Sequence, residues 1–195
     1  MTTATLFYVV GASGSGKDSI LRYLREHLIN LKSVGQGVEQ RSQPIAIAHR
    51  YITRASDDNE QAVCLSKEEF SLRQQHQLFA LEWQANGFDY AIGKEIDQWL
   101  AAGVSVIVNG SRDYINTAKA RYPQSFHSVR IDVADHVLQQ RLDNRSRETA
   151  TAIKDRMLRH QKIKDMFVSD STIVNESTVA NAARQFKNII DQVQK

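Results

Sequence analysis

Short runs of hydrophobic residues alternate along this chain with longer segments in which hydrophobic residues recur every three or four positions. The runs at residues 6–10 and 104–108 are almost wholly apolar, as expected of strands buried on both faces. After the first run, leucine and isoleucine recur at helical spacing, at Ile20, Leu21, Leu24, Leu28 and Leu31. This alternation predicts an α/β fold in which a parallel sheet is flanked by helices.

The same pattern predicts the remaining elements. Strands are expected at residues 45–53, 126–133 and 171–175, and helices at 66–75, 94–102, from about 111, across 134–165 and at 180–193. Ser66, with Glu69 three positions later, is typical of a helix start. Asn86-Gly87 predicts a hairpin turn between two strands in 78–93. Polar residues at 33–44 and 54–61 predict loops.

The first strand leads into a glycine-rich segment that fits the pattern G-x-x-x-x-G-K from Gly11 to Lys17. Glycines let consecutive backbone N–H groups point at one phosphate, and the following helix presents its positive end to the same anion. Lys17 adds a mobile positive charge. The segment therefore predicts an ATP-binding loop made of Gly11, Ala12, Ser13, Gly14, Ser15, Gly16, Lys17, Asp18 and Ser19.

Asp18 departs from this pattern, because a serine or threonine usually follows the lysine and binds Mg²⁺. A carboxylate is also a hard oxygen ligand, so Asp18, with the Ser19 hydroxyl beside it, is a candidate for the metal shell. The alternative is that Asp18 only stabilises the start of the helix, where aspartate is favourable. The sequence leaves both interpretations open.

Composition and charge narrow the classes of function. The 195 residues, 42% of them hydrophobic, suit one domain, and Cys64 alone allows no internal disulfide. No segment is typical of a membrane span or signal peptide, so a cytoplasmic protein is expected. The net charge of +3 does not favour nucleic acid, but residues 141–164 carry +5. That cluster indicates a specific anionic ligand or, equally, a solvated helix face.

Arginines follow several predicted strands, where ligands of parallel sheets bind. They are Arg50 and Arg54 after one strand and Arg112 after another, with Arg141, Arg145, Arg147 and Arg156 in the basic segment. Arginine suits bidentate binding of phosphate, and phosphoryl transfer needs positive charge and positioning. The strand at 104–108 ends without an obvious general base, and a phosphate acceptor, unlike an alcohol, is already ionised near neutral pH.

Taken in order, GASGSGKDS, AHRYITR, LSKEEF, ANGFDYAIGKEIDQWLAAG, VIVNGSR and QQRLDNRSRE resemble the ribose 1,5-bisphosphate phosphokinases, small relatives of the guanylate kinases. The resemblance runs from about residue 6 to 175. It implies transfer of the ATP γ-phosphate to ribose 1,5-bisphosphate, giving 5-phosphoribosyl 1-diphosphate (PRPP) and ADP, with Mg²⁺ as cofactor. It associates the chain with PRPP formation and phosphonate breakdown, and it is compatible with a homodimer.

The resemblance also implies an organisation and a set of roles. One P-loop kinase domain would have a core at 1–49 and 97–195, a substrate-binding region at about 50–96 and a helical lid at about 142–156. Acceptor binding would involve Arg50, Arg54, Tyr90, Asn109 and Arg112, and Lys17, Arg141, Arg145 and Arg156 would act in catalysis.

Two alternatives to this function stay open. One is a guanylate-type nucleoside monophosphate kinase. In its favour, Glu82 occupies the position at which guanylate kinases use a glutamate to recognise the guanine edge. Against it, Asn109 and Ser111 replace the paired aspartates that guanylate kinases carry on the central strand. The other is a binding module without catalysis, against which the complete phosphate loop and the lid arginines argue.

Overall fold

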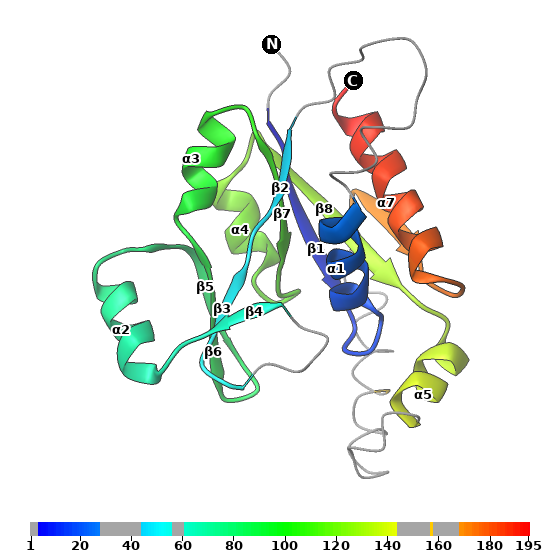
Figure 1. Cartoon of the computed structure of the whole chain (residues 1–195), viewed down its shortest axis with the longest axis horizontal. Helices are drawn as coiled ribbons and strands as arrows, with labels where there is room; N and C mark the ends of the chain where they lie inside the picture. Colours follow the sequence, from blue (N-terminus) through cyan, green and yellow to red (C-terminus); the bar gives the residue numbers. More distant parts are fainter. Residues whose placement is uncertain (1–3, 28–43, 56–60, 144–156, 158–167) are drawn as a thin grey trace.

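The computed structural model describes residues 4–27, 44–55, 61–143, 157 and 168–195. Its strands form a five-stranded and a four-stranded sheet (Figure 1). The larger sheet has the order β2-β7-β1-β8-β9, and every neighbouring pair is parallel. Its strands are β1 (Leu6–Gly11), β2 (Ile45–Ile47), β7 (Ser105–Asn109), β8 (Phe126–Asp132) and β9 (Ser171–Val174). The predicted parallel sheet is therefore confirmed.

Helices cover both faces of this sheet (Figure 1). Side chains alternate along β1, so Phe7 and Val9 pack against α1 (Lys17–His27) and α7 (Val179–Val193). Leu6 and Tyr8 point to the other face, which α3 (Glu95–Ala101) and α4 (Ile115–Arg121) cover. The short α5 (Asp135–Asp143) packs Leu138 and Leu142 against Ala12 of the glycine-rich loop.

The smaller sheet has the order β4-β3-β6-β5. Its strands are β3 (Arg50–Ile52), β4 (Ala62–Cys64), β5 (Phe79–Ala85) and β6 (Phe88–Gly93). One face is covered by α2 (Lys67–Gln75), whose Phe70 packs against Phe79 and Ala91. On the other face Leu81 and Ile92 pack with residues of the larger sheet, which joins the two sheets through one core.

Several local predictions are confirmed. Ser66 caps α2 by accepting a hydrogen bond from the Glu69 N–H at 3.1 Å. Asn86 and Gly87 both have positive φ, 52° and 79°, as a tight two-residue hairpin turn requires. The segment predicted as one strand, or a strand plus a turn, at 45–53 is two strands, β2 and β3, which belong to different sheets.

Other local predictions are wrong. The sequence pattern gave no strand at β4, a short edge strand in which Val63 and Cys64 are exposed and apolar alternation is weak. Helix α4 begins at Ile115 rather than near 111. The helical prediction for 134–165 is confirmed over α5 (Asp135–Asp143), and the rest of that range apart from residue 157 lies outside the described residues. Leu28, Leu31 and most of the expected lid at about 142–156 lie outside them as well. Within the described ranges, no helix is both long and apolar enough to cross a bilayer.

Candidate active site

The glycine-rich loop connects β1 to α1 at the carboxyl end of the larger sheet. Gly14 and Gly16 both have a φ of +91°, which side-chain-bearing residues rarely adopt, so glycine is required there. Within the loop the Ser15 N–H donates to the Ala12 carbonyl at 3.1 Å. The Lys17 ammonium reaches back and donates to the carbonyls of Gly11 at 2.9 Å and Ala12 at 3.1 Å. The lysine charge therefore lies against the loop.

A buried asparagine at the end of β9 supports the loop from outside. Asn175 is 3% exposed, and its Nδ2 donates to the Ser15 carbonyl at 2.7 Å. A β-carbon on Gly16 would overlap the Asn175 amide, so the second glycine is needed for this close approach as well as for its φ. Asn175 thus fixes the backbone that would face a phosphate.

Arg141, in the last turn of α5, lies beside the same loop. Its Nη2 donates to the Asn175 backbone carbonyl at 3.0 Å. Its Nη1 is buried, without a hydrogen-bond partner among the described residues, and lies 3.8 Å from where a β-carbon of Gly16 would be. Burial also lowers the pKa of Arg141. A cation with an unsatisfied donor therefore sits next to the loop, where an anion would satisfy it.

Asp18 occupies the first turn of α1 and faces β7. Its Oδ1 accepts a hydrogen bond from Nδ2 of Asn109, the last residue of β7, at 2.7 Å. Arg50 Nη2, from β3, lies 4.0 Å from the same oxygen. Asp18 is therefore the point at which the phosphate loop, the larger sheet and the smaller sheet meet.

Arg50 continues this cluster into the smaller sheet. Its guanidinium carbon lies 5.3 Å from the ring centroid of Tyr90 on β6, a cation–π distance. The Tyr90 hydroxyl accepts from Arg54 Nε at 3.4 Å. The structure thus brings together three of the predicted acceptor residues, Arg50, Arg54 and Tyr90, on the side of the sheet that faces the loop.

The segment after β7 is fixed by a buried tyrosine. The Tyr8 hydroxyl accepts from the Ser111 N–H and donates to the Ser111 carbonyl, both at 2.9 Å. Gly110 lies so close to the Tyr8 ring that a β-carbon would overlap it. Burial raises the pKa of Tyr8, so its hydroxyl stays neutral. These contacts hold the backbone that carries Asn109 and the half-buried Arg112.

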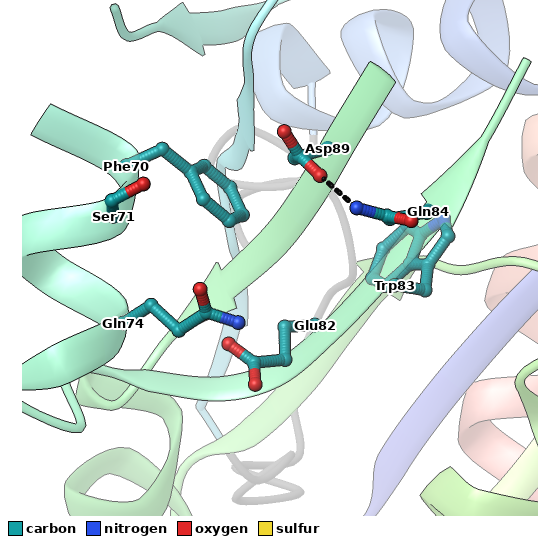
Figure 2. A pocket seen from close by; sticks show the side chains of 7 residues that line it. All are labelled: Phe70, Ser71, Gln74, Glu82, Trp83, Gln84 and Asp89. Atoms are coloured by element: carbon teal, nitrogen blue, oxygen red, sulfur yellow. Dashed lines mark hydrogen bonds between the residues drawn. The ribbon is translucent and has the colours of Figure 1, made fainter. Parts of the chain in front are cut away.

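Glu82 does not belong to the group formed by Arg50, Arg54 and Tyr90. It lines a cavity of about 340 Å³ between α2 and the β5–β6 hairpin, with Gln84, Asp89 and Gln74 (Figure 2). Glu82 pairs with Ala91, whose side chain packs under α2, whereas Trp83 pairs with Tyr90. Alternation along the strand therefore places Glu82 on the α2 face, opposite Tyr90 and Arg50. Asp89 in this cavity already accepts from Gln84 at 2.8 Å.

The predicted site residues thus fall into two adjoining groups. Lys17 and Arg141 lie with the loop, and Asn109, Arg50, Arg54 and Tyr90 extend from Asp18. Arg145 and Arg156 lie outside the described residues, and Ser19 is half-buried in the first turn of α1. Sequence reasoning missed Asn175, although its place directly after a parallel strand could have drawn attention to it.

No family model matches the chain. It is 46% identical over 186 residues to the ribose 1,5-bisphosphate phosphokinase PhnN of Burkholderia pseudomallei, covering 94% of either chain. It is 39% identical over 187 residues to the protein of the same name from Psychromonas ingrahamii, covering 95% of this chain and 89% of the other.

Solved structures agree on the fold. A guanylate kinase from Anaplasma phagocytophilum superposes with a TM-score of 0.69 at 16% identity, over 99% of this chain and 88% of that one. A gluconokinase from Sinorhizobium meliloti gives 0.51 at 14% identity, over 99% and 94%. The expected guanylate kinase-like α/β fold is therefore confirmed.

Proposed function

The chain belongs to the ribose 1,5-bisphosphate phosphokinase family, and on that premise we propose that it transfers the γ-phosphate of ATP to the 1-phosphate of ribose 1,5-bisphosphate. The products are 5-phosphoribosyl 1-diphosphate and ADP. An oxygen of the acceptor's 1-phosphate attacks the γ-phosphorus, and the bond from that phosphorus to the bridging oxygen of ADP breaks. Residues 50–96 would bind the acceptor, and residues 142–156 would form the lid.

On the nucleotide side, the loop from Gly11 to Ser19 would hold the ATP phosphates through its backbone N–H groups. Lys17 would exchange its contacts with the Gly11 and Ala12 carbonyls for phosphate oxygens. The unsatisfied Nη1 of Arg141 supports a role for this arginine on the transferring phosphate. Its burial beside the loop would make its charge more effective than at an exposed position. Arg145 and Arg156 would join it from the lid.

On the acceptor side, the Arg50–Tyr90–Arg54 group is the candidate for an acceptor phosphate, with Arg112 and Asn109 beside it. Asn109 is an amide and takes no proton, which suits an acceptor that needs no base. The second pKa of a phosphate monoester is about 6, so the acceptor oxygen is already largely ionised at neutral pH.

The residues present fit a magnesium ion. Asp18 is partly exposed, and its contacts with Asn109 and Arg50 are both made through Oδ1. Mg²⁺ in such enzymes needs only one or two protein oxygens besides the substrate phosphates and water. Asp18 and Ser19 would hold the ion, which would neutralise charge on the β- and γ-phosphates.

The observation that carries this proposal is the continuity between the phosphate loop and the arginine group, which meet at Asp18. It supports two phosphates, one from each substrate, being held side by side. The alternative, a guanylate-type kinase, rests on Glu82, and Glu82 lies on the opposite face of the small sheet from Tyr90.

A coupled ADP-release assay with ATP and Mg²⁺ tests the proposal, run in parallel with ribose 1,5-bisphosphate and GMP. Turnover with the sugar bisphosphate alone is expected, and it should be lost in Lys17→Met. Turnover with GMP alone would establish the guanylate-type alternative. No turnover with either acceptor, while ATP still binds, would favour a binding module instead.

A further inference from the structure

Binding of ATP and a metal ion does not by itself explain why position 18 is an aspartate. A hydroxyl at this position would suffice for a metal, and a carboxylate this close to ATP is repelled by the phosphates unless something offsets its charge. In the structure, Oδ1 of Asp18 accepts a hydrogen bond from Asn109 Nδ2 at 2.7 Å. The same oxygen forms an ion pair with Arg50 Nη2 at 4.0 Å. Both partners lie on the acceptor side of the site.

Asp18 decides how the Asn109 amide is oriented. An ionised carboxylate only accepts hydrogen bonds, so the amide must turn its Nδ2 toward Asp18 and its Oδ1 away. Asn109 is 6% exposed, and its Oδ1 has no hydrogen-bond partner within the described residues. If the Asn109 amide rotated by 180°, its Nδ2 would lose the charge-assisted hydrogen bond to the Asp18 carboxylate. Asp18 thus fixes which group of Asn109 is left for other partners.

Asp18 also acts on Arg50. The Arg50 side chain is 15% exposed and the Asp18 side chain 40%, so water screens the attraction between them only in part. The carboxylate draws the guanidinium toward the loop, while the Tyr90 ring lies 5.3 Å from its central carbon. Asp18 and Tyr90 are thus two of the groups that hold this cation in place. A serine hydroxyl at position 18 is neutral and one bond shorter, so it would neither attract Arg50 nor reach Asn109 in the same way.

From this geometry we infer that Asp18 is a positioning residue for the acceptor: through Oδ1 it orients Asn109 and Arg50 to receive the sugar bisphosphate. This inference rests on the proposed function. It leaves Oδ2 for magnesium, and it differs from the metal role because it operates when neither metal nor nucleotide is bound.

The test is equilibrium binding of ribose 1,5-bisphosphate by titration calorimetry, in EDTA and without nucleotide, for the wild type and Asp18→Ser. The sign of the change is diagnostic. Removing a negative charge should by itself tighten the binding of an anion. Loss of the positioning contacts should instead weaken it, by about three- to tenfold for a hydrogen bond of ordinary strength. Unchanged or tighter binding would overturn the inference.

A matched control and a coupled variant sharpen the test. Asp113 is exposed and follows the same strand end, so Asp113→Ser removes one negative charge without touching Asn109 or Arg50. Its binding should be unchanged or slightly tighter. If Asp18 acts partly through Asn109, Asp18→Ser should cost less in an Asn109→Leu background. Equal costs in both backgrounds would contradict that part of the inference, and melting temperatures would confirm that each variant is folded.

Failure of the inference can be told apart from failure of the proposed function. Wild-type protein that binds the bisphosphate with an affinity insensitive to Asp18→Ser overturns the positioning role alone. Wild-type protein that does not bind the bisphosphate in this titration, but turns it over in the coupled assay, also overturns the positioning role alone. Only wild-type protein that neither binds nor turns over the bisphosphate overturns the proposed function and the inference together.

Discussion

The support of the phosphate loop by Asn175 leads to a quantitative prediction. Asn175→Ala removes the hydrogen bond from Nδ2 to the Ser15 carbonyl but keeps the Asn175 backbone carbonyl that holds Arg141. Asn175 is 3% exposed, so water does not readily replace the lost donor. A buried carbonyl left unpaired costs about 1–3 kcal/mol. We expect the free energy of unfolding to fall by an amount in that range.

The same change should weaken nucleotide binding. A loop that is no longer fixed must be ordered when ATP binds, and part of the lost stabilisation then appears as lost affinity. A share of about 1.4 kcal/mol corresponds to a tenfold rise in the dissociation constant for ATP. Calorimetric titration with a non-hydrolysable ATP analogue measures this constant, and urea unfolding measures the stability of the same samples.

Asn188→Ala serves as the control, because Asn188 is an exposed asparagine on the nearby α7. It should leave both quantities within about 0.5 kcal/mol of the wild type. If Asn175→Ala lowered stability but left ATP affinity unchanged, Asn175 would support the fold without shaping the nucleotide site, and the reasoning would be refuted.

Three further predictions follow from the same structure. Gly16→Ala should lower ATP affinity more than Gly103→Ala, measured by the same titration: both glycines have positive φ, but only Gly16 has a neighbouring side chain that a β-carbon would overlap. Tyr8→Phe should lower the unfolding free energy by about 1–3 kcal/mol in urea, because the Ser111 N–H loses its partner and the Ser111 carbonyl keeps only the longer hydrogen bond from the Tyr114 N–H at 3.3 Å, and it should raise KM for the acceptor. Arg25→Met should raise KM for the acceptor more than KM for ATP in steady-state assays, because Arg25 donates to the backbone that enters β3; equal effects would contradict this.

Much of the fold was predictable because its patterns are local. The apolar runs of β1 and β7 are buried on both faces. A run of this kind predicts a buried strand whichever strands become its neighbours in the sheet. The Ser66 cap and the Asn86-Gly87 turn depend on residues a few positions apart. The edge strand β4 was not predictable, because it is stabilised by pairing with β3 and not by a pattern of its own.

The candidate site was predictable in part for the same reason. The phosphate loop is a contiguous motif, and the arginines stand out after strands. Their grouping depends on which strands become neighbours, so the meeting of Asp18 with Asn109, 91 residues away, was not visible in the sequence. Nor was Asn175, whose partner Ser15 is 160 residues away. The two faces of β5, which separate Glu82 from Tyr90, required the strand register.

Phosphorus NMR of the completed reaction tests the central claim most directly, namely that phosphate is transferred to phosphate. With ATP, Mg²⁺ and ribose 1,5-bisphosphate, the proposed function predicts a pair of coupled diphosphate signals from the sugar, appearing in step with ADP. The 5-phosphate signal should persist as a monoester. A new monoester signal on a sugar hydroxyl, or inorganic phosphate alone, would contradict it.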